Sequence, residues 1–278
     1  MVESDDKKPI QGILMRALPP GTILQLMYLR ERLVNIKPGR FIEIGPGSGE
    51  ISGMLLELGW EGVSYDLEPR TVDRLRDRFR VQISQGRFDA RNEDFLQADK
   101  NSLDRADLII SCMVMEHLTD DLENKFMQLS AELLMDDCFM IALVPASPEQ
   151  WGVEDEIAGH CKRYTRAAVH ELAGNNRWEV RHLAGLTYPL SNLILPISNL
   201  LVMYAEKYKL EKSDMEKTKL SGIRDVRFKT TFPKFLSLVL NEFALMPFHW
   251  AQKIFSSARG SLVLYFEVSP LKFRGKSE

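Results

Sequence analysis

Short apolar runs alternate with longer amphipathic stretches along most of the chain. The short runs predict strands at residues 40–44, 62–65, 88–95, 108–114, 139–144 and 178–183. The longer stretches carry apolar residues at helical spacing and predict helices at 22–34, 49–58, 68–80, 119–133 and 165–173. Strands that alternate with helices are typical of an α/β fold, so we expect a mostly parallel sheet covered by helices.

Two of these helices begin with a capping signal. Thr119 and Thr165 stand where an N-cap is expected, and Asp120 and Asp121 place negative charge where it suits the helix dipole. The apolar residues of the helix after Thr119 form one stripe that we expect to be buried: Leu122, Phe126, Leu129 and Leu133.

A long segment, about 189–260, separates these elements from a final apolar run, 261–268, which predicts a strand. A lone strand at this place needs a sheet to join, and the sheet lies upstream. We therefore predict one domain over 1–278, with a core at 1–188, a helical insertion at 189–260 and a returning strand at 261–270. A separate helical domain after Tyr188 is the alternative.

The insertion has an apolar part, 190–204, and a basic part, 207–234. Residues 186–205 have about the length of a membrane span. Pro189 and Pro196 interrupt them, so we interpret the segment as a buried or interfacial helix.

Composition narrows the class of protein. The chain has 278 residues, 27% of them charged, and a net charge of −3, which gives no argument for nucleic acid as a partner. The cysteines Cys112, Cys138 and Cys161 show neither a disulfide framework nor zinc spacing, and the charged N-terminus is no secretory signal. We expect a cytoplasmic protein. His170, His182 and His249 show no metal-ligand spacing, so we expect no metal.

A glycine-rich turn lies between the first strand and the next helix. It holds Gly45, Gly47 and Gly49, whereas a dinucleotide fingerprint would place its third glycine at position 50, which is Glu50. Glu43, two residues before the first glycine, is ill suited to a pyrophosphate and well suited to an ammonium group. The turn therefore favours a positively charged ligand over NAD.

Two more acidic residues follow strand ends. Asp66 ends the second strand, a position that faces the ligand crevice of open α/β sheets and can accept ribose hydroxyls. Asp94, with Phe95 beside it, closes the expected third strand and is suited to an adenine ring, although Asp99 competes for that role.

These segments resemble class I S-adenosylmethionine-dependent methyltransferases, of the kind that act on small molecules. The resemblance runs through EIGPGSGE, YDLEP, NEDFL, DLIISCMVMEHL and GHCKRYTRAAVHEL, and covers about residues 40–183. It implies a Rossmann-like sheet of seven strands, the last one antiparallel, with S-adenosylmethionine as the cofactor.

The resemblance also implies roles for individual residues. Glu43, Gly45 and Gly47 would line the methionine end of the cofactor, and Asp66 would hold the ribose. The remaining residues of the implied cofactor site are Pro46 and Gly49 in the turn, Leu67, Asp94 and Phe95 near the adenine, and Cys112 and Met113 near the sulfonium.

The polar stretch before residue 165 rims the same crevice. His160 in it is a candidate general base, and Tyr164 a candidate acceptor-binding or catalytic residue; either side chain could instead hold the loop. Glu116 and His117 more readily order the turn after the fourth strand than take part in chemistry.

The acceptor is expected to be a small molecule, such as a sugar, a lipid-linked compound or a secondary metabolite. No Asn/Asp-Pro-Pro-Tyr/Phe motif follows the fourth strand, which disfavours nucleic acid. Residues 189–235 could meet a membrane surface or a lipid-linked acceptor. The rival functions are a catalytically silent cofactor-binding protein and an NAD-dependent oxidoreductase.

Overall fold

The structure, a computed structural model, describes residues 17–98, 103–206, 217 and 232–271. Its centre is a seven-stranded sheet in the order β3-β2-β1-β4-β5-β7-β6. The strands are β1 (Arg40–Ile44), β2 (Glu61–Tyr65), β3 (Phe88–Arg91), β4 (Ala106–Cys112), β5 (Leu134–Pro145), β6 (Trp178–Leu186) and β7 (Val263–Pro270). The helices are α1 (Pro20–Leu33), α2 (Glu50–Glu57), α3 (Pro69–Arg78), α4 (Arg80–Ser84), α5 (Asp120–Leu133), α6 (Val153–Ala158), α7 (Arg166–Asn175), α8 (Leu190–Glu206) and α10 (Glu242–Ile254).

The sheet is parallel except at its last strand. Strands β1 to β5 pair with one another in parallel, and β7 is antiparallel to both β5 and β6. Six strands therefore run in one direction and β7 runs in the other. This arrangement confirms the predicted fold class, including the antiparallel final strand.

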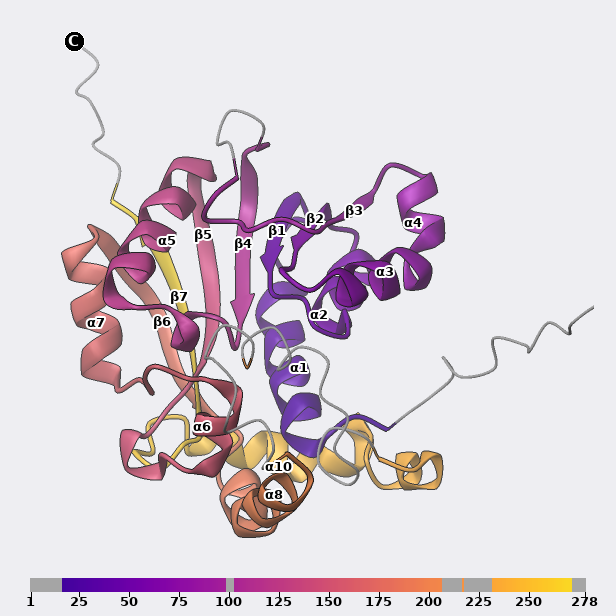
Figure 1. Cartoon of the computed structure of the whole chain (residues 1–278), viewed down its shortest axis with the longest axis vertical. Helices are drawn as coiled ribbons and strands as arrows, with labels where there is room; N and C mark the ends of the chain where they lie inside the picture. Colours follow the sequence, from indigo (N-terminus) through magenta and orange to yellow (C-terminus); the bar gives the residue numbers. More distant parts are fainter. Residues whose placement is uncertain (1–16, 99–102, 207–216, 218–231, 272–278) are drawn as a thin grey trace, which may run out of the picture.

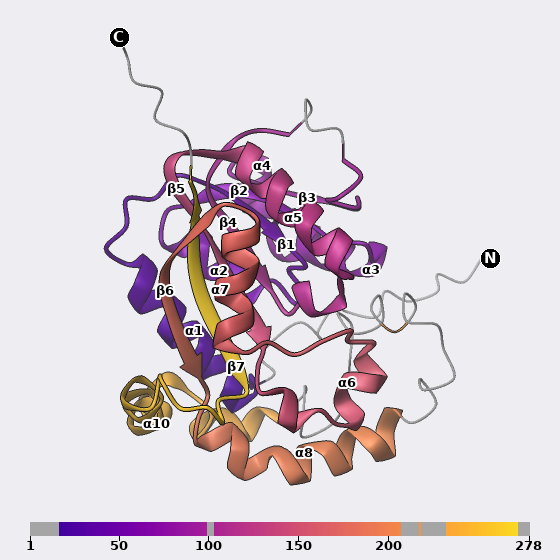
Figure 2. The same cartoon turned by 90° about the vertical axis from the view of Figure 1, so that its left-hand side faces the viewer.

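Both faces of the sheet are covered by helices (Figure 2). Because side chains alternate along a strand, Phe41 of β1 packs on the side of α1, α2 and α3, whereas Ile42 packs on the side of α5 and α7. Both residues are at most 1% exposed. Burial of each such side chain stabilises the fold by about 1.5–3 kcal/mol.

Local signals are confirmed in part. Thr165 caps α7, since its hydroxyl accepts a hydrogen bond from the Ala168 N–H at 3.0 Å. Thr119 occupies the predicted N-cap position of α5, although its side chain makes no cap hydrogen bond. Leu122 was expected in the buried stripe and is 41% exposed, because Glu123 and Met127 face inward instead.

The largest differences from the predicted strand boundaries are at β3 and β5. The strand expected at 88–95 ends at Arg91, because a polar turn follows it. Strand β5 begins directly at the end of α5, at Leu134, well before the predicted start at 139.

Helices α6, α8 and α10 lie beyond the carboxyl ends of the parallel strands (Figure 1). Helix α8 packs against α6, and α10 packs against α1. No helix within the described residues has the length and apolarity that a bilayer crossing requires. The predicted basic part, 207–234, lies almost wholly outside the described residues.

Candidate functional site

The glycine-rich turn lies where the strand order reverses. Strand β1 pairs with β2 on one side and with β4 on the other. From β1 the sheet continues through β2 to β3 in one direction and through β4 to β5 in the other. In open α/β sheets, ligands bind outside the carboxyl ends of the strands at this switch point. The turn after β1 and the residues that follow β2 and β4 therefore form the candidate site.

The three glycines of the turn have positive φ, at 69° for Gly45, 54° for Gly47 and 81° for Gly49. A Cβ on Gly45 would lie 2.4 Å from Val114 Cγ2, and one on Gly49 would lie 2.5 Å from Leu75 Cδ2. A Cβ on Gly47 would meet nothing within 4 Å. Packing thus explains two of the glycines, whereas Gly47 leaves its backbone open to a ligand.

Pro46 is buried and shapes the turn from within. Its carbonyl accepts a hydrogen bond from the Gly49 N–H at 2.8 Å. This bond closes the turn directly before α2, whose first N–H groups then face the carboxyl edge of the sheet.

Glu43 is buried beneath the turn, at 2% exposed. Its carboxylate accepts hydrogen bonds from the hydroxyl groups of Ser52, on α2, and Ser64, on β2, the latter at 3.0 Å. Burial raises the pKa of Glu43 to about 7, although these two bonds oppose the rise. The group is therefore a buried carboxyl poised near neutrality at the start of the turn.

Asp66 follows β2 and is half-buried. Its carboxylate accepts the Glu68 N–H at 2.8 Å, and the Gly47 N–H also stabilises its charged form. Burial nevertheless raises the pKa of Asp66 to about 6. Asp66 is thereby held beside the open glycine, with Leu67, also half-buried, next to it.

Asp94 and Phe95 lie in the turn after β3, and both have partners within the protein. Asp94 accepts hydrogen bonds from the Leu96 N–H at 3.0 Å and from Gln97 Nε2 at 2.7 Å. Phe95 is 3% exposed and packs in the core against Tyr65. The predicted contacts of both residues with an adenine ring remain predictions.

Cys112 ends β4, and Met113 follows it. Burial raises the pKa of the Cys112 thiol to about 12, so the thiol is uncharged. Met113 has a φ of 55°, an uncommon value for a residue with a side chain, and its N–H donates to the Leu143 carbonyl at 2.8 Å. Such backbone strain occurs more often at functional sites than elsewhere.

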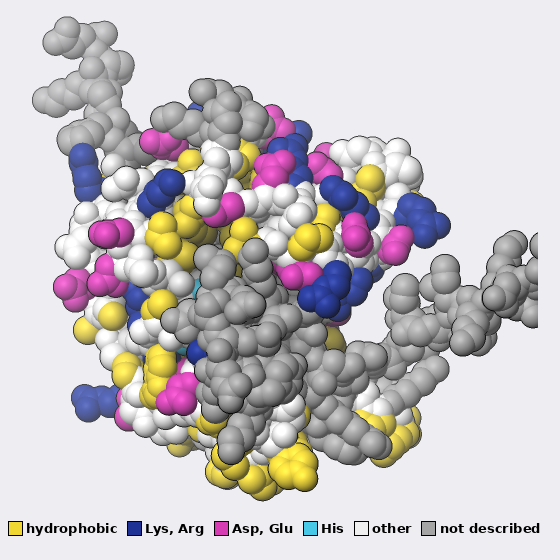
Figure 3. All heavy atoms as spheres, viewed as in Figure 1, with side chains coloured by type: hydrophobic (Ala, Val, Ile, Leu, Met, Phe, Trp, Pro, Cys, Tyr) yellow, Lys and Arg dark blue, Asp and Glu magenta, His cyan; other side chains and the backbone are white. Residues whose placement is uncertain are grey.

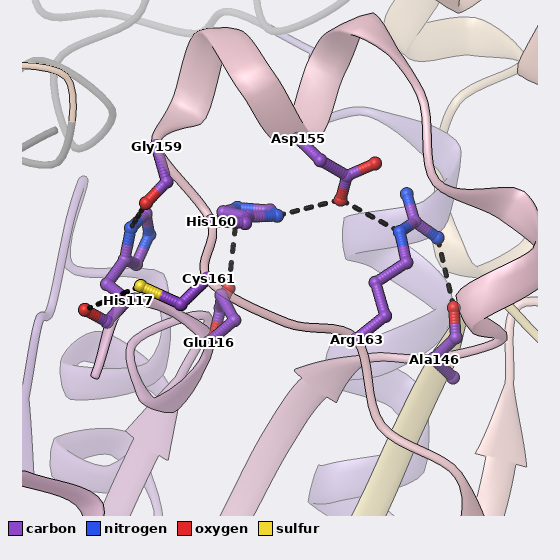
Figure 4. A network of polar contacts seen from close by, with 8 residues as sticks. All are labelled: Glu116, His117, Ala146, Asp155, Gly159, His160, Cys161 and Arg163. Atoms are coloured by element: carbon purple, nitrogen blue, oxygen red, sulfur yellow. Dashed lines mark hydrogen bonds and ion pairs between the residues drawn. The ribbon is translucent and has the colours of Figure 1, made fainter. Parts of the chain in front are cut away.

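A network of polar side chains lies next along the edge (Figure 4). His160 Nδ1 lies 2.8 Å from Asp155 Oδ1, and the Arg163 Nε–H donates to the same oxygen at 2.8 Å. Burial alone would raise the pKa of Asp155, but these bonds lower it below its usual value. One ionised carboxylate therefore orients both His160 and Arg163.

Glu116 and His117 face His160 from the turn after β4. His160 Nε2 lies 3.8 Å from Glu116 Oε1, and the two imidazole rings make an edge-to-face contact at 4.8 Å. Burial raises the pKa of Glu116 to about 8 and lowers that of His117 to about 4. The three side chains thus lie together, although the sequence separates His160 from the other two.

Tyr164, at 2% exposed, lies on the other side of the same loop. Its hydroxyl donates to Glu123 of α5, whose carboxylate also receives the Lys162 ammonium group at 2.8 Å. These bonds fasten the loop to α5. The predicted catalytic role of Tyr164 remains a prediction, and its hydroxyl has a structural partner.

The comparisons with known proteins identify the family and the fold. Residues 22–183 match the model of a family described as "Methyltransferase domain". The chain belongs to this family of methyltransferases. The match confirms the class of enzyme and the cofactor, S-adenosylmethionine, that the sequence resemblance implied.

Among solved structures, the O-MT domain of StiE (residues 961–1257) has a TM-score of 0.51 at 15% identity, covering 90% of this chain and 74% of that one. Magnesium protoporphyrin IX methyltransferase (ChlM) from Synechocystis PCC 6803, with bound SAH, also has a TM-score of 0.51, at 16% identity, covering 66% and 84%. The pyocyanin biosynthetic protein PhzM is 18% identical with a TM-score of 0.48; the match covers 59% of this chain and only 52% of PhzM. No curated protein sequence matches the chain. At these identities, the likeness is one of fold.

Sequence reasoning did not single out Asp155, Ser52 or Ser64. The two serines belong to different elements and meet Glu43 only in the folded sheet. Asp155 carries a local signal in hindsight, since it lies in the same short polar stretch as His160 and Arg163.

Proposed function

We propose that this protein transfers the methyl group of S-adenosylmethionine to a small-molecule acceptor. The observation that carries the proposal is the turn at the strand-order switch point, in which Gly47 presents open backbone beside Asp66. When bound, the cofactor supplies an electrophilic methyl group. The task left to the protein is to hold and align the reactants, which can contribute about 7–11 kcal/mol.

The residues present fit this cofactor. The open face of Gly47 allows a ligand to approach the main chain, and the Asp66 carboxylate is suited to accept the two ribose hydroxyls. Glu43 brings a carboxyl to the strand end where the ammonium group of the methionine part would lie. Cys112 and Met113, at the end of β4, form the other side of this edge.

A pair of glycine variants tests cofactor binding. Gly86 has a φ of 70° and open space around it, like Gly47, but lies in the turn between α4 and β3. Gly47→Ala and Gly86→Ala therefore carry similar backbone strain, about 1 kcal/mol. Calorimetry should show loss of S-adenosylmethionine affinity in Gly47→Ala alone. Equal affinity in both variants, or tighter binding of NAD than of S-adenosylmethionine, would refute the site.

The acceptor is proposed to meet the cofactor beside Glu116, His117 and His160. Support comes from their place directly after β4 and from the absence of an Asn/Asp-Pro-Pro-Tyr/Phe motif there. The name of one fold neighbour, magnesium protoporphyrin IX methyltransferase, describes an enzyme acting on a small molecule. Labelled methyl transfer into candidate small molecules is the assay. Cofactor binding without transfer to any of them would favour the catalytically silent alternative.

A second proposal concerns contact with a membrane surface or a lipid-linked acceptor. Apolar side chains gather at the lower edge in Figure 3, over α8 and α10. The most exposed of them on these two helices, each at least 60% exposed, are Leu193, Ile197, Leu200, Tyr204, Phe243, Trp250 and Ile254. Apolar surface of this extent marks contact sites for membranes or partners.

Co-sedimentation with anionic vesicles tests this contact. Ile197→Asp should reduce the bound fraction, because it places a charge on the apolar face. Val81→Asp, at a site on α4 that is similarly exposed (62% against 63%), is the matched control. The absence of vesicle binding by the unmodified protein would exclude a membrane-associated location.

A further inference from the structure

Glu116, His117 and His160 each offer one potential metal-ligand atom, and these atoms lie within 4.8 Å of one another. Glu116 and His117 come from the turn Met115–His117 after β4, whereas His160 comes from the loop between α6 and α7. In Figure 4, the side chains of Glu116 and His160 point toward each other across this gap. The set could not be predicted from the sequence, because His160 is distant along the chain from Glu116 and His117.

Hydrogen bonds fix which nitrogen of each imidazole carries the proton. His117 Nδ1 lies 3.2 Å from the carbonyl oxygen of Gly159, and His160 Nδ1 lies 2.8 Å from Asp155 Oδ1. A carbonyl and an ionised carboxylate can only accept, so Nδ1 is the donor in both rings. In its neutral form each ring therefore has its lone pair on Nε2.

This arrangement is the outer shell that metal-binding histidines use. Such a histidine donates its other ring N–H to a carboxylate or a backbone carbonyl, which sets the tautomer and the ring orientation. Here Asp155 takes that role for His160 and Gly159 takes it for His117. Arg163 in turn holds Asp155, at 2.8 Å.

Glu116 provides the second, independent observation. The residue is 0% exposed, and neither carboxylate oxygen has a hydrogen-bond partner on another described residue. A buried carboxylate is costly without a compensating charge or a set of donors. His160 Nε2, which can become positive, lies 3.8 Å from Glu116 Oε1, beyond hydrogen-bond distance. The Arg163 guanidinium acts on Glu116 only through space, because its Nε–H donates to Asp155. A bound dication would supply the missing charge.

We propose that Glu116, His117 and His160 bind one divalent first-row transition metal ion, such as Zn²⁺. Two imidazoles and one carboxylate form the ligand set of catalytic zinc and non-haem iron sites, and imidazole disfavours Mg²⁺ and Ca²⁺. Bonds of about 2.0–2.1 Å in a tetrahedral site place the ligand atoms about 3.3 Å apart. The ligand atoms, now up to 4.8 Å apart, would have to approach one another by up to about 1.5 Å.

Three protein ligands leave at least one coordination position open, as in catalytic sites. The turn that carries Glu116 also carries Val114, which borders Gly45 of the cofactor loop. On the basis of the proposed function, the open position is suited to an oxygen atom of the methyl acceptor. A metal-bound Nε2 cannot also accept a proton, so the ion would replace His160 as the predicted base.

Metal binding is tested on the full chain after chelator treatment, without cofactor or acceptor. Calorimetry with Zn²⁺ and visible absorption on titration with Co²⁺ should each show one ion per chain, and Mg²⁺ should bind far more weakly. His160→Ala and Glu116→Gln should weaken Zn²⁺ binding by more than about 100-fold, since loss of an outer-shell partner alone costs 10–100-fold. Asp155→Asn should weaken Zn²⁺ binding by only about 10–100-fold, because Asp155 is an outer-shell partner of His160.

His170→Ala is the matched control, because His170 is an exposed histidine of α7 outside the cluster. It should bind Zn²⁺ like the unmodified protein. Glu116→Gln should fold and lose the rise in Tm that Zn²⁺ produces; if this buried variant does not fold, the partly exposed His160→Ala carries the test. Absence of a one-to-one Zn²⁺ complex, or equal affinity in His160→Ala and His170→Ala, would overturn the site.

A separate titration with S-adenosylmethionine keeps the two proposals distinguishable. Cofactor binding without metal binding overturns the metal site alone. Metal binding without cofactor binding supports the metal site and counts against the proposed function.

Discussion

Replacing Glu43 by glutamine should stabilise the protein at alkaline pH. Burial raises the pKa of this carboxyl from 4.5 to about 7. The folded-state pKa therefore lies above the unfolded one, so the contribution of Glu43 to stability is full below about pH 4.5 and is lost as the pH rises through about 7. A shift of this size corresponds to about 3 kcal/mol of unfolding free energy. Glu43→Gln keeps an oxygen that can accept from Ser52 and Ser64 and removes the buried charge.

Urea denaturation of the cofactor-free protein at pH 5 and pH 8.5 measures this effect. The unfolding free energy of Glu43→Gln should exceed that of the unmodified protein by up to about 3 kcal/mol at pH 8.5, and by far less at pH 5. Glu57→Gln, at an exposed site of the neighbouring helix α2, should change stability by no more than about 0.5 kcal/mol. A gain independent of pH, or a loss of stability at pH 8.5, would refute the reasoning.

The same variant should bind S-adenosylmethionine roughly 10–100-fold more weakly by calorimetry, because a bond to a charged group contributes about 1.5–3 kcal/mol; unchanged affinity would remove Glu43 from the cofactor site. Asp66→Asn should also weaken cofactor binding, since an amide cannot accept two hydroxyls as a carboxylate does, and it should leave the cofactor-free Tm within a few degrees. Arg32→Met should lower the unfolding free energy at pH 7 by about 1.5–3 kcal/mol, because Glu267 loses two hydrogen bonds of 2.7 and 2.8 Å. Hydrogen bonds from Arg32 lower the pKa of Glu267 despite its burial, so the loss should shrink as the pH falls toward 4. Tyr164→Phe should destabilise the fold by about 1–3 kcal/mol by removing one of the two hydrogen-bond partners of the buried Glu123 carboxylate, and a much larger loss of methyl transfer than of stability would be needed to make this hydroxyl catalytic.

Apolar periodicity was enough to predict the strands of the sheet. Runs such as Leu108–Ile110 are buried on both sides, and a buried parallel strand leaves a continuous apolar run in the sequence. The end of β3 was harder to place, because pairing stops at Arg91 while the residues beyond it still include an apolar one, Phe95. Phe95 is buried by packing of a turn against the core, which strand periodicity does not describe.

The candidate site also has residues that local sequence patterns predict and residues that only the folded structure brings together. Glu43 and Asp66 could be predicted, because their positions relative to the glycines follow from the order of strand, turn and helix. The environment of His160 could not, because it depends on the turn after β4 lying against the loop after α6. Nothing local in the sequence fixes that contact.

The place of β7 has a consequence for the order in which the sheet is completed. Among the described strands, β6 pairs only with β7, and β7 separates it from β5. While the chain is being synthesised, β5 is therefore an open edge and β6 has no partner until the residues of β7 emerge. Such late, non-local pairing slows folding and leaves unpaired strand edges accessible to other chains. Truncation before Val263 should yield a protein that aggregates during expression, even though the residues at the strand-order switch point are all present.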